Sequence, residues 1–141
     1  MKFQTFLAFD FGTKSIGVAI GQTITNTATP LLSINTINHC PNWSQIKIHI
    51  YQWNPDRIII GLPLNMDGTE QSVTQDSRNF AHQIKIRFKI PIQFHDERLT
   101  TIEARHQLFL KRGCKSLTKS NIDSLSAAII LESFLLQINN H

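Results

Sequence analysis

The sequence predicts an α/β fold, in which a five-stranded mixed sheet with its first three strands antiparallel is covered by helices on both faces. Two apolar stretches at the start of the chain are joined by a tight Gly-Thr-Lys connection, which is typical of an antiparallel hairpin. Further along, helical periods alternate with short apolar runs. Because such alternation requires crossover connections, the later strands are expected to be parallel and buried between helices.

The first half of the chain supplies the hairpin, a third strand, a helix and a fourth strand. Residues 3–11 and 15–21 are expected to form the hairpin, and a third strand is expected around residues 31–34. Apolar side chains recur at helical spacing over residues 43–53, directly before an Asn-Pro pair. The run Arg-Ile-Ile-Ile at residues 57–60 is continuously apolar after its first residue, as in a strand buried on both faces.

The second half supplies a helix, the fifth strand and two final helices. Thr69 is expected to cap a helix whose apolar positions keep a 3.6-residue period, and residues 91–94 follow as a strand. Residues 100–103, Thr-Thr-Ile-Glu, form a capping box that opens a helix ending at Gly113. Ser120 or Asn121 is expected to open the last helix. The element order matches the ribonuclease H-like arrangement.

Composition indicates a single domain over residues 1–141. Hydrophobic residues make up 41% of the chain, with only six Gly and five Pro, as in an ordinary globular domain. Cys40 and Cys114 lack metal-site spacing and are too few for a disulfide framework, so we expect reduced thiols. The most apolar stretch, residues 127–136, contains Glu132 and is too short to span a bilayer. We therefore expect a soluble, cytoplasmic protein with no membrane partner.

The charge balance favours a polyanionic partner without identifying one. Fourteen Lys and Arg stand against ten Asp and Glu, which gives a formal net charge of +4. Such a field attracts nucleic acid, but a solvated basic surface explains it equally well. Two clusters of cations are candidates for contacts, one at residues 85–89 and one at residues 111–119.

Carboxylates occur where distant segments end at one edge of the predicted sheet. Asp10 ends the first strand, and Asp96 and Glu97 follow the fifth strand. Asp123 is expected in the first turn of the last helix. Carboxylates packed together repel one another unless a cation lies between them, and hard oxygen ligands suit Mg²⁺ or Mn²⁺. A pair of such ions can hydrolyse a phosphodiester, so the sequence predicts a metal-dependent nuclease.

Structural interpretations of the same residues remain open at this point. Asp10 could accept backbone hydrogen bonds in a turn, and Asp123 could simply complement the helix dipole. Asp96 and Glu97 point to opposite faces of a strand, so only one can be a ligand, and periodicity does not choose between them. His95 is a candidate base, although a buried and hydrogen-bonded histidine is the favoured interpretation.

Four motifs occur in order along the chain: FDFGTKSIGVA at 9–19, GLPLNMDG at 61–68, DERLTTIEA at 96–104 and IDSLSAAIIL at 122–131. Taken together they resemble the YqgF/RuvX family of Holliday junction resolvases and pre-16S ribosomal RNA nucleases. The resemblance covers nearly the whole chain. It implies a ribonuclease H-like fold and a nuclease that depends on Mg²⁺ or Mn²⁺.

The resemblance also implies roles for individual residues. The catalytic, metal-binding acids become Asp10, Glu97 and Asp123, so that Glu97 is selected over Asp96. Substrate phosphates are expected to face a further set of motif residues, namely Lys14, Gly61, Pro63, Asn65, Arg98 and Thr100. Two positions depart from the family pattern: Ser15 replaces a frequent basic residue, and Ser126 a small apolar one.

The basic segment before the last helix is a further predicted contact. It leads directly into the helix that bears Asp123, so Lys115 and Lys119 are expected to guide the substrate backbone past the metals. The alternative path for the substrate is the cluster at residues 85–89.

Processing of the 5′ end of pre-16S ribosomal RNA is the function that the resemblance favours, and resolution of four-way DNA junctions is its alternative. Monomer and homodimer both remain open. The DFGT stretch also resembles the phosphate-binding hairpin of actin-like ATPases and sugar kinases, but those proteins close two lobes over a nucleotide. A non-catalytic nucleic-acid-binding module is the more distant alternative, and the presence of all three acids counts against it.

Overall fold

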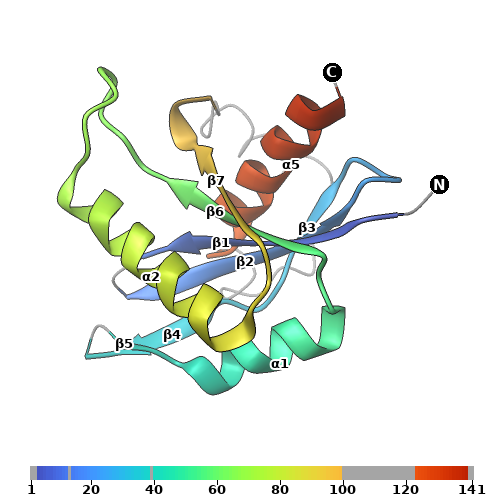
Figure 1. Cartoon of the computed structure of the whole chain (residues 1–141), viewed down its shortest axis with the longest axis horizontal. Coiled ribbons are helices and arrows are strands. Elements are labelled where there is room, and N and C mark those ends of the chain that lie inside the picture. Colours follow the sequence, from blue (N-terminus) through green and yellow to red (C-terminus); the bar gives the residue numbers. More distant parts are fainter. Residues whose placement is uncertain (1–2, 13, 39, 100–122, 140–141) are drawn as a thin grey trace.

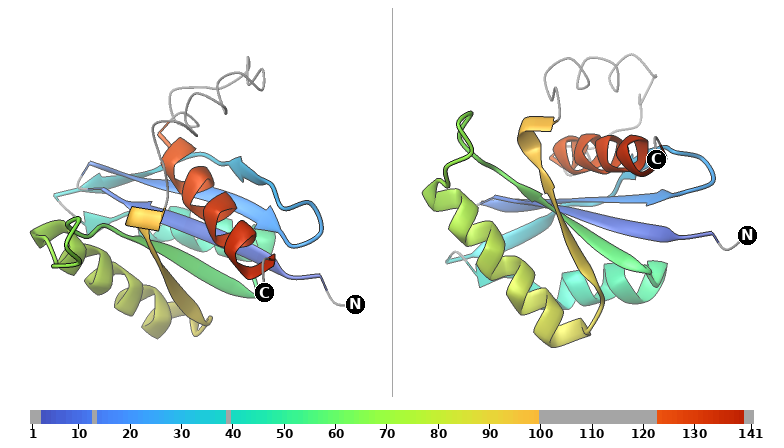
Figure 2. Two further views of the ribbon diagram at one scale, coloured as in Figure 1. Left: turned by 90° about the horizontal axis from the view of Figure 1, so that it is seen from above. Right: turned by 45° about the horizontal axis from the view of Figure 1, so that its top comes forward.

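Over the residues that the structure describes, a twisted mixed sheet is covered by helices on both faces (Figures 1 and 2). The computed structural model describes residues 3–12, 14–38, 40–99 and 123–139. Its strands follow the order β5-β4-β2-β1-β6-β7, and β3 also pairs with β2. The α/β class, the mixed sheet and the helices on both faces are as predicted.

The centre of the sheet is formed by β1 (Thr5–Phe11) and β2 (Ser15–Gln22), which pair as an antiparallel hairpin. On the other side of β1 lies β6 (Arg57–Leu62), parallel to it. The edge strand β7 (Ile92–Asp96) is parallel to β6. The carboxyl ends of β1, β6 and β7 therefore meet at one edge of the sheet, where binding sites form in open α/β sheets.

The third strand, predicted around residues 31–34, is wrong in its bounds, because residues 31–33 lie between two strand segments. The segments β3 (Ala28–Pro30) and β4 (Ile34–Ile37) both pair with β2, and the short β5 (Cys40–Pro41) pairs with β4. The sheet thus has seven strand segments where five strands were predicted. Proline supplies no backbone N–H to a ladder, so Pro30 is a natural end for β3.

Two helices cover one face of the sheet, and their ends follow local capping chemistry. Helix α1 (Trp43–Trp53) matches its predicted range; the side chain of Asn42 accepts a hydrogen bond from Gln45 N, and Asn54 ends the helix in the left-handed conformation. Helix α2 (Ser72–Phe88) begins three residues after Thr69, which was wrongly predicted as its cap. Its start is stabilised instead by the backbone N–H of Gln71, which donates to Thr74 Oγ at 2.9 Å.

Helix α5 (Leu125–Asn139) covers the other face. Ala128 N donates to the carbonyl oxygen of Ser124, and α5 begins at Leu125, later than predicted; Ser120 and Asn121, which were expected to open it, lie outside the described residues. Asp123 consequently precedes the helix and does not lie in its first turn. The predicted helix over 100–113 falls outside the described residues.

Alternation along the strands divides the core into two layers. Phe6, Ala8 and Ile59 pack beneath α5, whose side facing the sheet is fully buried. Leu7 and Phe9 belong to the opposite layer, beneath α1 and α2. Among the described helices, none combines the length and apolarity that a membrane span needs.

Candidate active site

Asp10 lies one residue before the end of β1, on the face of the sheet that α5 covers. Its antiparallel partner on β2 is Gly17. On the other side, the parallel register sets Phe9 beside Ile60, so the next residues, Asp10 and Gly61, are neighbours. The carboxylate of Asp10 is therefore flanked on both strands by residues that have no side chain.

Both flanking glycines are required by the close approach of other groups. A Cβ on Gly17 would lie 2.9 Å from the carbonyl oxygen of Asp123 and 3.5 Å from the Cβ of Ala127. A Cβ on Gly61 would lie 2.7 Å from Ile130 Cδ1. These distances show that the small residues allow α5 to pack directly over the strand ends beside Asp10.

Glu97 brings a second carboxylate to the same place. It is the first residue of the 3₁₀ turn η1 (Glu97–Leu99), which follows β7 directly. Its Cδ atom would lie 3.4 Å from a Cβ on Gly61, so its side chain extends over that glycine. Burial raises the pKa of Glu97 to about 7, with further contributions from the charges of Asp10 and Asp96. Burial likewise raises the pKa of Asp10 to about 6.

Asp96 is directed elsewhere. Its carboxylate accepts hydrogen bonds from the guanidinium of Arg98, with Oδ2 lying 2.7 Å from Nη2 and 3.0 Å from Nε. The hydrogen bonds from Arg98 lower the pKa of Asp96. Of the two adjacent acids, Glu97 therefore lies near Asp10, and Asp96 binds Arg98; that Glu97 is the metal ligand stays a prediction.

The backbone of Asp123, and not its side chain, contacts the sheet edge beside Asp10. Its carbonyl oxygen lies over Gly17, the partner of Asp10, and its side chain is exposed. No three His, Cys, Asp or Glu side chains of the described residues are gathered closely enough to hold a metal ion. The structure thus brings Asp10 and Glu97 together and sets Asp123 beside them, without joining all three carboxylates in one cluster.

Arg98 connects η1 to the loop that follows β6. Besides binding Asp96, it donates from Nη1 to the backbone oxygen of Met66 at 3.2 Å. Its guanidinium also lies 3.3 Å from where a Cβ of Gly68 would be, and Gly68 has a φ of +89°, which favours glycine. Arg98 was expected to face substrate phosphates; it is placed at this edge, but its donors are largely engaged within the protein.

The other residues of that loop are held by the loop itself. Asn65 Nδ2 donates to Thr69 Oγ1 at 2.9 Å, and the backbone N–H of Asn65 donates to the carbonyl oxygen of Thr69. The carbonyl oxygen of Pro63 accepts a hydrogen bond from the buried hydroxyl of Thr74. Hydrogen bonds within the loop therefore hold its conformation, and the bond from Thr74 attaches the start of the loop to α2.

Gly61 does not lie in this loop as predicted. It is buried inside β6, which continues to Leu62, and Ile130 and Glu97 occupy the space beside it where a phosphate was expected. Lys14 is exposed in the turn between β1 and β2, at the same edge as Asp10. The remaining predicted contacts, Thr100, Lys115 and Lys119, lie outside the described residues.

His95 is a buried structural residue. It is 3% exposed, its Nε2 atom lies 2.9 Å from Ser133 Oγ on α5, and burial lowers its pKa. The favoured interpretation of this residue as a buried, hydrogen-bonded histidine is confirmed.

Two residues that shape the site were not recognised in the sequence. Gly17 is one, although its place opposite Asp10 follows from the hairpin register. Ser124 is the other: it is fully buried, and its Oγ atom accepts a hydrogen bond from Val18 N at 2.9 Å. This bond ties the residue next to Asp123 to β2, and only the assembled fold reveals it.

Comparison with known proteins identifies the family of this chain. The model of the RuvX family, described as a Holliday junction resolvase, matches residues 4–137. This chain belongs to the RuvX family. A relative from Pectobacterium carotovorum is 54% identical over 95% of this chain and 96% of that protein, and one from Salmonella paratyphi B is 56% identical over 95% and 97%. Both bear the name "Putative pre-16S rRNA nuclease".

Solved structures show that the RuvX chain shares its fold with a more distant protein. Thermus thermophilus RuvC, solved with a Holliday junction substrate, matches with a TM-score of 0.60 at 10% identity, over 96% of both chains. A further structure of RuvC from Thermus thermophilus has a TM-score of 0.57 at 11% identity. At such identities the likeness concerns the fold alone, and it confirms the predicted ribonuclease H-like arrangement.

Proposed function

We propose that this RuvX-family chain is a metal-dependent nuclease that hydrolyses phosphodiester bonds in the processing of the 5′ end of pre-16S ribosomal RNA. The observation that carries the proposal is the pair of Asp10 and Glu97 carboxylates, brought together over glycines at the sheet edge with raised pKa values. The choice of RNA is supported by the names of relatives that are 52–56% identical to this chain.

A divalent cation fits this donor set. Asp10 and Glu97 are hard oxygen ligands, and the charge of Asp10 is one of the causes that raise the pKa of Glu97. A cation between two such carboxylates favours their ionised forms, which burial otherwise disfavours. Asp10 and Glu97 would hold the ion, and Asp123, whose backbone oxygen lies over Gly17, would be a third ligand. Magnesium and manganese both suit these ligands.

When bound, such an ion supplies Lewis-acid stabilisation of the charge that develops on the phosphate in the transition state. The residues of the chain have distinct tasks around it. Asp10 and Glu97 supply the negative charge, and Gly17 and Gly61 allow α5 and the side chain of Glu97 to come close to Asp10. Lys14, exposed in the adjoining turn, is suited to meet a neighbouring phosphate.

The second candidate function is resolution of four-way DNA junctions. It is favoured by the description of the matching family and by the shared fold with RuvC. Resolution requires two paired active sites, whereas RNA processing can proceed with one. Oligomeric state therefore helps to separate the two functions.

The test is cleavage by the full chain of two substrates, an RNA containing the 5′ leader of 16S ribosomal RNA and a synthetic four-way DNA junction. Each is incubated with Mg²⁺ or Mn²⁺, and the Asp10→Asn variant is the matched control. We expect cleavage of the RNA at defined positions and none by Asp10→Asn. Cleavage that survives in the variant, or in excess chelator, would contradict the metal-dependent mechanism, and cleavage of the junction alone would select the second function.

A further inference from the structure

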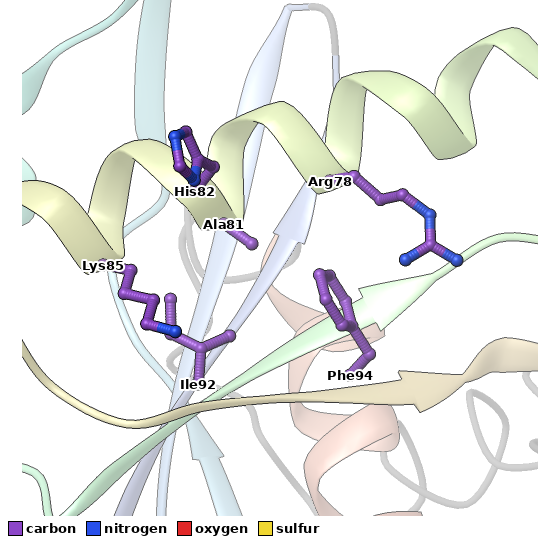
Figure 3. A pocket seen from close by; sticks show the side chains of 6 residues that line it. All are labelled: Arg78, Ala81, His82, Lys85, Ile92 and Phe94. Atoms are coloured by element: carbon purple, nitrogen blue, oxygen red, sulfur yellow. The ribbon is translucent and has the colours of Figure 1, made fainter.

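A groove lies between α2 and the edge strand β7, outside the site described above. We define the α2/β7 groove by the residues that line its two adjoining hollows. The first is lined by Arg78, Ala81, His82, Lys85, Ile92 and Phe94, and the second by Lys85, Lys89, Ile90, Pro91 and Ile92. The two hollows share Lys85 and Ile92, so they form one continuous surface, of which Figure 3 shows the first hollow.

The groove is cationic on its helical side. Arg78 and Lys85 are seven residues apart on one side of α2, and Lys89 follows the last residue of the helix as its C-cap. Figure 3 shows that Arg78 and Lys85 extend from the helix toward β7. Arg78 pairs with Glu70 at 2.7 Å, but no carboxylate of the described residues lies within salt-bridge distance of Lys85 or Lys89. None of the residues that line the groove is acidic.

The strand side of the groove is apolar. Ile92 and Phe94 project from β7 toward α2, and Phe94 remains 37% exposed. The guanidinium of Arg78 lies over the ring of Phe94, 5.3 Å from its centroid. An aromatic ring and an arginine plane beside a line of lysines are the features by which proteins hold single-stranded nucleic acid, because bases stack on planar groups while cations follow the phosphates.

The groove also leads toward the candidate active site. Phe94 is three residues before Glu97, a distance of about 10 Å along an extended strand. The groove and the acids lie on opposite faces of the sheet, and β7 is its edge, so a strand can pass from one to the other around that edge. From Arg78 to Lys89 the cations span about 16 Å at the rise of an α-helix.

We propose that the α2/β7 groove binds a single-stranded segment of the nucleic-acid substrate, with Lys85 and Lys89 on its phosphates and Phe94 against a base. This inference rests on the proposed function, which supplies the nucleic acid, but it concerns a binding surface separate from the carboxylates. A strand of another protein that added to β7 would use the backbone of the edge and would not require the lysines.

The experiment measures binding of a labelled single-stranded RNA, and of the duplex made with its complement, as a function of salt. All proteins carry Asp10→Asn so that cleavage does not interfere. Lys85→Gln/Lys89→Gln is compared with Lys47→Gln, which removes an exposed charge on α1 outside the groove. Phe94→Leu tests stacking, since leucine keeps an apolar side chain at this exposed position.

For single strands, log affinity falls by about 0.7 per phosphate contact for each unit of log salt, so each lost contact should cost about fivefold at about 0.1 M salt relative to 1 M. We therefore expect the double variant to bind single-stranded RNA about 5- to 25-fold more weakly, with a slope flatter by about one unit. Phe94→Leu should weaken binding about fivefold or more without changing the slope, and Lys47→Gln should change neither.

An unchanged slope in the double variant, or an equal change in Lys47→Gln, would overturn the proposal. Equal losses for the single strand and the duplex would overturn its single-stranded character. Cleavage of the same RNA by the chain with Asp10 intact is measured separately. Absence of cleavage there would contradict the proposed function, while the binding comparison would still decide whether the groove holds nucleic acid.

Discussion

Two neighbouring acids, Asp96 and Glu97, have opposite environments because the chain changes direction between them. Asp96 is the last residue of β7 and binds Arg98, which lowers its pKa. Glu97 begins the 3₁₀ turn and lies over Gly61, where burial raises its pKa to about 7. From the strand pattern alone, only the statement that one of the two enters the site was available, and the choice of Glu97 rested on the family resemblance. The choice depends on the register of β6 with β7 and on Gly61, which a single strand pattern does not specify.

At this residue pair we predict that Glu97→Gln impairs cleavage far more than Asp96→Asn. Loss of a partner that orients a metal ligand lowers metal affinity or activity by about 10- to 100-fold, and loss of the ligand itself should lower activity more. Asp96→Asn should cost about tenfold or less, because it loosens Arg98 without removing a group that faces Asp10. Single-turnover cleavage of the leader RNA measures both variants, and circular dichroism confirms that they are folded. Equal losses would mean that Asp96 also serves in the site.

The strands and helices were predicted best where the pattern was continuous. The run at 57–60 and the helical period at 43–53 each have one interpretation, and both elements form there. The predicted ends of strands and helices were wrong where a tertiary contact determines them. Residues 31–33 between β3 and β4 are not part of a strand, and although Leu31 N still donates to the carbonyl oxygen of Val18, the N–H of Val18 donates to Ser124 Oγ. A residue just before α5, far along the chain, thus replaces a strand partner, which local patterns do not reveal.

For α5 we predict that Ser124→Ala destabilises the protein by about 1–3 kcal/mol, since the buried N–H of Val18 loses its acceptor. Ser126→Ala is the matched control, because Ser126 lies two residues further along and is only partly buried. That change should alter the free energy of unfolding by about 0.5 kcal/mol or less. Urea denaturation in chelator measures both variants. A stable Ser124→Ala protein would show that water or a shift of α5 satisfies Val18.

Considered as a whole, the molecule assembles its site from segments that are far apart in sequence. The convergence of Asp10 with the end of the fifth strand could be predicted, because parallel strands in adjacent positions end at one edge. The proximity of α5 could also be predicted in part, from Ala127 and Ala128. The exposure of the Asp123 carboxylate could not be predicted, since the direction of this side chain depends on where regular helical bonding starts.

Burial of Asp10 and Glu97 in one site lowers the free energy of unfolding by an amount that depends on pH, and the last prediction concerns this dependence. Asp10 has a pKa of about 6 and Glu97 of about 7 in the folded protein, against reference values of 3.8 and 4.5. Between about pH 4 and pH 7 the folded protein therefore binds more protons than the unfolded chain. Since stability falls with pH wherever the native state binds more protons, the two acids lower the free energy of unfolding as the pH rises through this window.

Asp10→Asn removes one of these groups, so in chelator the variant should be more stable than the unmodified chain by about 1–3 kcal/mol at pH 8, at about 1.4 kcal/mol for each unit of pKa shift. The difference should shrink to nothing near pH 4. His49 and His95 have lowered pKa values and act in the opposite direction, but they are present in both proteins and cancel in the difference. Asp76→Asn, which changes an exposed acid on α2, is the control and should show no such pH-dependent difference.

Mg²⁺ or Mn²⁺ should reverse the order of stability at pH 8. An ion that binds only the folded state adds about 2.7 kcal/mol when its concentration is 100 times its Kd, and Asp10→Asn should gain much less. Thermal unfolding at several metal concentrations, with and without chelator, measures this effect. If Asp10→Asn is less stable than the unmodified chain in chelator at pH 8, the Asp10 carboxylate stabilises the fold by itself, and the interpretation of this pair as a metal site loses its energetic basis.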